Sequence, residues 1–189
     1  MAKTALKPVL LTALGLIASS CALTAFAQPD SVAIFAQNTE SIFLAEERLG
    51  KLATENGTSQ AVRNYGSTIA KQDATMEISL KRAAQTVQVV LPATADAEEQ
   101  KFYDRLSKLS GAAFDRAYAA NMVQVQQAQD DAFRSVAELG PFAAINMAPI
   151  KTFAEDNLRV IEARLQQAQQ MAETVGANSP KPSFTAPAN

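Results

Sequence analysis

The stretch that decides the fold is Ser59 to Val89, SQAVRNYGSTIAKQDATMEISLKRAAQTVQV. Its apolar residues recur every three or four positions, which is the spacing of one face of an α-helix. The spacing therefore predicts one long amphipathic helix. Asp73 lies on the same face, four residues after Ile69 and three before Met76, so we expect its carboxylate to point into the protein. The apolar residues of this face are Val62, Tyr65, Ile69, Met76, Leu80, Ala83 and Val87.

Four more segments carry apolar residues at helical spacing and are separated by short breaks. They cover residues 30–55, 96–109, 111–139 and 141–175. Asp30 and Asp96 are placed to cap the first two helices at their N-termini. Asn56-Gly57 is expected to adopt the left-handed backbone conformation and to end the first helix before residue 59, a left-handed stop. A connection as short as this one predicts antiparallel neighbours. The predicted fold is all-α, an antiparallel four-helix bundle with a short extra helix over residues 96–109.

Pro149 falls inside the predicted helix over residues 141–175. Proline lacks a backbone N–H donor, and its ring clashes with the preceding helical turn. We therefore expect a break or a kink in this helix at Pro149.

The N-terminus has the three parts of a secretory signal peptide. Lys3 and Lys7 precede a short apolar run, Val9 to Ala18, and Ala25-Phe26-Ala27 is a small-x-small cleavage site. We expect residues 1–27 to be removed, which delivers the protein to the periplasm or the medium. The alternative is lipid attachment at Cys21. The residues just before Cys21 argue against it, because they lack the large aliphatic side chain that is usual there.

The composition and charge of the chain exclude some classes of function. The chain has 189 residues, of which 48% are apolar and 19% charged, with a net charge of −2 that becomes −4 if Lys3 and Lys7 leave with the signal. An acidic chain does not attract nucleic acid, and the apolar run near the N-terminus is too short to span a bilayer. Residues 28–175 are predicted to form the helical domain, and the Pro-rich residues 176–189 a disordered tail.

One polar residue interrupts the apolar face of each long predicted helix. These residues are Glu46, Asp73, Gln126 and Asn157. A buried polar group is costly unless it is paired, so such a residue is either satisfied within the core or part of a site. We expect the four to form a polar cluster in the bundle core. Because desolvating a carboxylate costs so much, we also expect Asp73→Leu to leave stability level or raise it.

The chain contains no histidine, and Cys21, its only cysteine, lies within the predicted signal. Histidine-based zinc and haem sites and catalytic triads are therefore excluded, and no glycine-rich phosphate loop is present. Glu46, Asp73 and Glu77 could still hold Mg, Ca or Mn through oxygen atoms. The competing interpretation is that Glu46 and Asp73 pair with basic or amide groups while Glu77 is solvated. We expect no cofactor.

Three runs of sequence resemble the bacterial family known as domain of unknown function 4142. They are Leu49-Gly50-Lys51-Leu52-Ala53, residues 59–65 (SQAVRNY) and residues 106–118 (LSKLSGAAFDRAY), of which the last is the most specific. The resemblance extends from about Phe35 to Met171. It implies an exported, ferritin-like four-helix domain with no established activity.

Members of that family commonly carry three histidines, which correspond to Asp73, Gln126 and Asn157 here, or to Ala154 in place of Asn157 if the prolines are matched. The chain thus keeps polar residues where the resemblance implies imidazoles. Two functions stay open. The first is a non-enzymatic exported domain that serves envelope structure or binds an unknown protein partner. The alternative is a degenerate ferritin-like carboxylate site for a hard divalent metal.

Overall fold

The computed structural model describes residues 29–140 and 145–176, so the predictions for the signal peptide, Cys21 and most of the tail lie outside the described residues. Within those two stretches every regular element is helical, which confirms the predicted all-α class. The elements are α1 (Pro29–Asn56), α2 (Gln60–Thr86), α3 (Ala97–Leu106), α4 (Gly111–Ala137), the short 3-10 helix η1 (Ile145–Met147) and α5 (Ala148–Thr174).

The helix ends follow local capping chemistry, with some departures from the predicted ends. The Asp96 side chain accepts hydrogen bonds from the backbone N–H groups of Glu98 and Glu99 at 2.8 and 3.0 Å, as a cap should. Helix α1 begins at Pro29, one residue before the predicted cap position Asp30. Helix α2 ends at Thr86, before Val89, because Gln88 turns left-handed with φ of 58°.

The left-handed stop predicted at Asn56-Gly57 is wrong. The described glycines with positive φ are Gly111 and Gly176, and the Gly57 amide instead makes a helical bond to the carbonyl of Ala53 at 3.0 Å. A Cβ on Gly57 would collide with that same carbonyl. Glycine is needed here for close packing of the chain, not for an unusual backbone angle.

The break predicted at Pro149 lies one residue before it, because η1 ends at Met147 and α5 begins at Ala148, which places Pro149 in the first turn of α5 and not in a helix interior. The missing N–H costs nothing at this position, since the first amides of a helix have no partner within it. The predicted helix over 141–175 is therefore shorter, beginning at Ala148.

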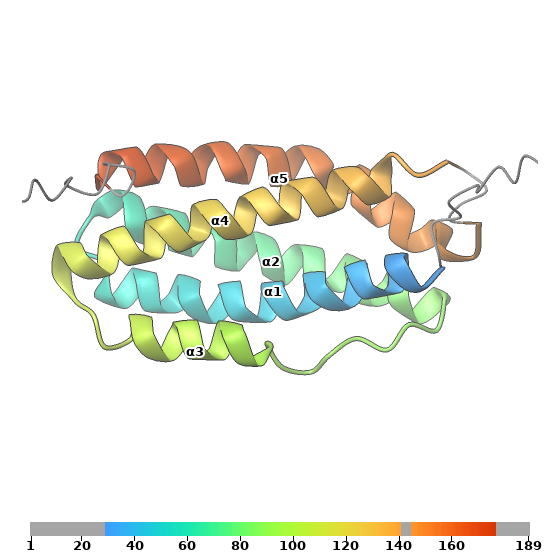
Figure 1. The fold of residues 1–189 in the computed structure, drawn as a ribbon, viewed down its shortest axis with the longest axis horizontal. Helices are drawn as coiled ribbons and strands as arrows, with labels where there is room; N and C mark the ends of the chain where they lie inside the picture. Colours follow the sequence, from blue (N-terminus) through green and yellow to red (C-terminus); the bar gives the residue numbers. More distant parts are fainter. Residues whose placement is uncertain (1–28, 141–144, 177–189) are drawn as a thin grey trace, which may run out of the picture.

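The four long helices run side by side, and the chain crosses the length of the molecule once between α2 and α4 (Figure 1). Helix α2 ends at one end of the molecule, residues 87–110 return along the outside through α3, and α4 starts at the opposite end. Helices α2 and α4 thus run in the same direction, with α1 and α5 opposite to both. Helix α1 packs mainly on α2, and α4 mainly on α5, while α3 lies against α1 and α4.

The tightest helix contact is between α1 and α2. A Cβ on Gly50 would lie 2.5 Å from the carbonyl oxygen of Gly66, and one on Gly66 would lie 2.7 Å from the Cβ of Ala53. Two glycines facing each other let the two backbones approach closely. This contact fixes how the polar residues farther along α1 and α2 face each other.

The interior has two apolar clusters, one toward each end of the molecule. The first contains Leu49, Ile69, Met122 and Ala168, and the second contains Phe43, Met76, Phe133 and Ile161. On every long helix a buried polar side chain lies between these two sets. The core is thus apolar at both ends and polar in the middle.

Candidate functional site

Five buried polar side chains separate the two apolar clusters, and we call them the polar layer. They are Glu46 on α1, Asp73 on α2, Gln126 and Gln129 on α4, and Arg164 on α5. Each is at most 2% exposed. Three of the four residues predicted as core polar positions, Glu46, Asp73 and Gln126, are therefore brought together by the fold.

Glu46 is bound by two amide groups from α4. Gln126 Nε2 donates to Glu46 Oε1, and Gln129 Nε2 donates to Glu46 Oε2 at 3.1 Å. The two glutamines are three residues apart, so they project from the same face of the helix. This arrangement gives each carboxylate oxygen of Glu46 a hydrogen-bond donor without supplying any charge.

The charge comes from Arg164, whose guanidinium lies between the two carboxylates. Its Nη1 is 2.7 Å from Asp73 Oδ1 and 3.8 Å from Glu46 Oε2, and its Nε donates to Gln72 Oε1 at 2.8 Å. The side chain is 1% exposed, and arginine is almost never buried without such partners. Arg164 is thus the only cation within the polar layer and serves both acids.

Sequence reasoning missed Arg164, although the signal was present. Arg164 follows Ile161 by three residues and precedes Ala168 by four, and both of these are fully buried. Leu165, the neighbouring apolar residue, is only half-buried. Phe153, Ile161, Ala168 and Met171 are all buried on this helix, and Arg164 faces the core with them.

One guanidinium does not neutralise two buried carboxylates. Burial, followed by the charge on Asp73, raises the pKa of Glu46 well above its usual range. Burial also raises the pKa of Asp73 to about 6, even though Arg164 favours its ionised form. Protonation of Glu46 leaves one negative and one positive charge in the layer, which is the cheapest state to bury.

Further polar atoms in and beside the layer are buried without a hydrogen-bond partner. The hydroxyls of Tyr65 and Tyr118 belong to this group, and burial followed by the charge of Glu46 raises the pKa of each. Both tyrosines follow the expected helical spacing. The layer members among these atoms are Asp73 Oδ2, Gln126 Oε1, Gln129 Oε1 and Arg164 Nη2.

Asn157, the fourth predicted core polar position, does not join the layer, and this part of the prediction is wrong. It is half-buried, and its Nδ2 donates to the carbonyl of Phe153 at 2.8 Å, one turn earlier in α5. A side chain that bonds its own helix in this way needs no partner across the core. Ala154, the alternative position, is fully buried among apolar residues.

Glu77, the third candidate metal ligand, points elsewhere. It binds Lys81, and Lys81 Nζ is also 3.3 Å from Oε1 of the buried Glu40. In the part of the chain that the structure describes, no three acidic, histidine or cysteine side chains are grouped to hold a metal ion. A metal between Glu46 and Asp73 does not fit, because the guanidinium of Arg164 lies there.

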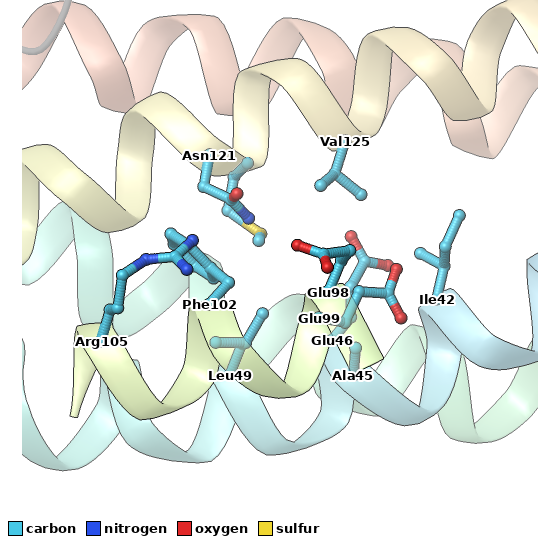
Figure 2. A pocket seen from close by; sticks show the side chains of 11 residues that line it. Ile42, Ala45, Glu46, Leu49, Glu98, Glu99, Phe102, Arg105, Asn121 and Val125 are labelled. Carbon is cyan, nitrogen blue, oxygen red and sulfur yellow. The ribbon is translucent and has the colours of Figure 1, made fainter. Parts of the chain in front are cut away.

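A pocket of about 230 Å³ leads from the surface to Glu46, between α1, α3 and α4 (Figure 2). Its walls are mostly apolar, including Leu49, Phe102 and Met122, whereas Glu98 and Glu99 from the first turn of α3 lie near Glu46. Ser41 donates to Glu99 at 3.1 Å. Among the residues of the layer, Glu46 is the one that lines this pocket.

Comparison with known proteins places the chain in a family without assigning a role to it. The family described as a domain of unknown function (DUF4142) matches residues 19–171. No curated protein and no solved structure matches the chain. Within residues 29–140 and 145–176, no helix combines the length and apolarity needed to cross a membrane. Because the match covers most of the sequence, this chain belongs to the DUF4142 family.

Proposed function

We propose that this protein is an exported, non-enzymatic helical domain that serves envelope structure or binds a protein partner. Its fold is proposed to be an antiparallel four-helix bundle of the ferritin-like type. The course of the chain supports this assignment, because ferritin-like bundles have one long crossover connection and residues 87–110 make one crossover between α2 and α4.

The observation that carries the non-enzymatic assignment is the position of Arg164. In ferritin-like proteins inward-facing carboxylates hold metal ions at mid-bundle. Here a covalently attached guanidinium supplies the positive charge, 2.7 Å from Asp73 and 3.8 Å from Glu46. Two glutamine amides occupy the Glu46 oxygens as well. These contacts support a structural role, in which the layer fixes how the four helices face each other without a metal.

Metal titration tests this proposal against the carboxylate-site alternative. The melting temperatures of the wild type and of Asp73→Leu are compared with and without Mg, Ca or Mn, together with elemental analysis of the purified protein. A ligand at 100 times its Kd adds about 2.7 kcal/mol to stability, which is several degrees in melting temperature for a domain of this size. We expect no such shift in the wild type. A shift that Asp73→Leu abolishes would overturn the proposal.

Export is tested separately by the intact mass of the protein that the cell accumulates. We expect a chain that begins at Gln28, after the Ala25-Phe26-Ala27 site. A lipid-modified N-terminal Cys21 would instead mean that the domain is anchored to a membrane surface. A chain that keeps Met1 in the cytoplasm would remove the envelope role altogether.

A further inference from the structure

The pocket beside Glu46 combines apolar walls with carboxylates at one end. Helices α1 and α4 supply mostly apolar side chains, and Phe102 of α3 forms a third wall. Glu98 and Glu99 lie at the same end as Glu46 (Figure 2). Arg105 lies at the other end, with its guanidinium carbon 5.7 Å from the centre of the Phe102 ring. The end of the pocket that reaches the core is therefore acidic, and its middle is apolar.

The polar layer has one positive charge too few, and the acid with the weaker ion pair lines this pocket. The layer holds two carboxylates and one guanidinium, and Arg164 Nη1 lies 2.7 Å from Asp73 but 3.8 Å from Glu46. The hydrogen bonds to Glu46 come from two uncharged amides. Of the residues in the layer, Glu46 is the one that the pocket reaches. A cation in the pocket would therefore meet the buried carboxylate that most needs one.

The walls favour an organic cation over a metal ion. Hard cations require about six oxygen ligands, whereas Leu49, Met122 and Val125 present carbon and sulfur atoms to the pocket. In the ranges that the structure describes, no three acidic side chains are grouped to hold a metal. Since a cavity of about 150 Å³ holds benzene, a pocket of about 230 Å³ has room for about nine non-hydrogen atoms.

We propose that this pocket binds a small primary amine whose apolar body has about eight carbon atoms. Its ammonium group donates to Glu46, and its carbon atoms pack on Leu49, Phe102 and Met122. Each carboxylate oxygen has two lone pairs, so the ammonium fits beside the amide donors that Glu46 already has.

The ammonium also completes the charge balance of the layer. Burial raises the pKa of Glu46 well above its usual range in the free protein. A bound ammonium supplies the second positive charge, so both carboxylates can be ionised, and the proton of Glu46 leaves to solvent. This binding goes beyond the structural or partner-binding role proposed above and does not depend on it. The metal titration and the mass of the exported chain measure other properties, so each proposal can fail alone.

Titration of the full exported chain with 2-phenylethylamine, followed by the shifts of backbone amides in NMR spectra, tests the proposal. At pH 7.5 the amine is charged, because alkyl ammonium groups titrate near about pH 10. We expect saturable shifts around Ala45, Phe102 and Met122, with a dissociation constant of about 1 mM or lower for a ligand of this size. The matched ligand 2-phenylethanol has a hydroxyl in place of the ammonium and should bind about 10-fold more weakly or worse.

Three variants assign the binding to this pocket. Glu46→Gln keeps the size of the side chain but removes its charge, so affinity for 2-phenylethylamine should fall by about 10-fold or more. Val125→Phe fills the pocket and leaves every charge in place, and it should cause a similar loss. Glu47→Gln is the matched control, because Glu47 pairs with the exposed Lys51 and does not line the pocket. Circular dichroism verifies that all three variants fold.

Several outcomes would overturn the proposal. One is the absence of saturable shifts up to about 10 mM amine, which is weaker than a ligand of this size should bind. Equal affinity for 2-phenylethanol would show that the ammonium is not recognised, and unchanged affinity in Glu46→Gln or Val125→Phe would place the amine elsewhere. Shifts centred on the groove between residues 31–42 and 128–139, whose lining is uncharged, would do the same.

Discussion

The two ends of the core and its middle are stabilised by different kinds of interaction. At the ends, side chains such as Leu80 and Phe114 are fully buried among other apolar groups and contribute through packed volume. In the middle, Asp73 and Arg164 are equally buried but contribute through a charge pair and its hydrogen bonds. Packing tolerates volume-conserving exchange, whereas a charge pair loses most when one partner is removed.

This difference explains why the polar layer contributes more to the specific alignment of the four helices than to the stability of the fold. A buried ion pair rarely stabilises a fold more than well-packed apolar residues of the same volume would. The layer contacts, however, are directional and connect all four long helices, since Glu46, Asp73, Gln126 and Arg164 each come from a different one. Sliding one helix by a turn would leave buried charges unpaired. In the apolar clusters, sliding a helix by a turn carries no comparable free-energy penalty.

The largest effect is expected from Arg164→Leu. Removal of the guanidinium leaves Asp73 and Glu46 buried without a cation, so unfolding free energy at pH 7 should fall by about 3–5 kcal/mol. The loss should shrink near pH 5, where protonation neutralises the carboxyls. Urea unfolding at both pH values measures it. Leu80→Ala should cost about 2–5 kcal/mol at either pH, and the exposed Arg159→Leu should cost little.

Arg164 also reverses the expectation for Asp73→Leu, which the sequence predicted to be neutral or stabilising. Alone, this substitution leaves the guanidinium with Glu46 at 3.8 Å as its only acid, so we now expect a loss of about 3 kcal/mol. The double variant Asp73→Leu/Arg164→Leu should lose less than the sum of the two single variants, by about 1–3 kcal/mol. Simple additivity would mean that the pair is not coupled.

The next effect concerns pH. Because burial raises the pKa of Asp73 from 3.8 to about 6, the folded state binds this proton more tightly than the unfolded state does. Stability from this group is complete below about pH 4 and is lost as pH rises through 6, by about 3 kcal/mol for two pH units. The raised pKa of Glu46 acts in the same direction.

Unfolding free energy should therefore decline between pH 4.5 and 7.5, which urea titrations at intervals of about half a pH unit would follow. Asp73→Asn should flatten this slope, whereas Leu80→Ala should lower the whole curve and keep its shape. A wild type that becomes more stable over this interval would show that Asp73 is ionised in the folded state under acidic conditions.

The sequence predicts the helices better than it predicts the layer, for a physical reason. Apolar periodicity over more than twenty residues averages out local ambiguity, so each long helix is found, although its ends differ, and the Asp96 cap agrees with the structure. A single polar residue has no such averaging. On α5 both Asn157 and Arg164 fit the three- and four-residue spacing, and only their partners on other helices distinguish them.

The smallest effect is expected from a comparison of Gln126 and Asn157. Both are amide residues that interrupt the apolar face of their helix in the sequence, but only Gln126 belongs to the polar layer. Gln126→Ala removes the donor to Glu46 Oε1 and leaves a void in a fully buried site, so we expect a loss of about 2–3 kcal/mol. Asn157→Ala removes only a bond to the carbonyl of Phe153 in the same helix. Alanine is the better helix former by roughly half a kcal/mol, so this substitution should be neutral or slightly stabilising. Urea unfolding of both variants at pH 7 measures the contrast. If Asn157→Ala cost as much as Gln126→Ala, polar groups outside the layer would contribute as those within it do, and the division of the core into apolar ends and a polar middle would fail.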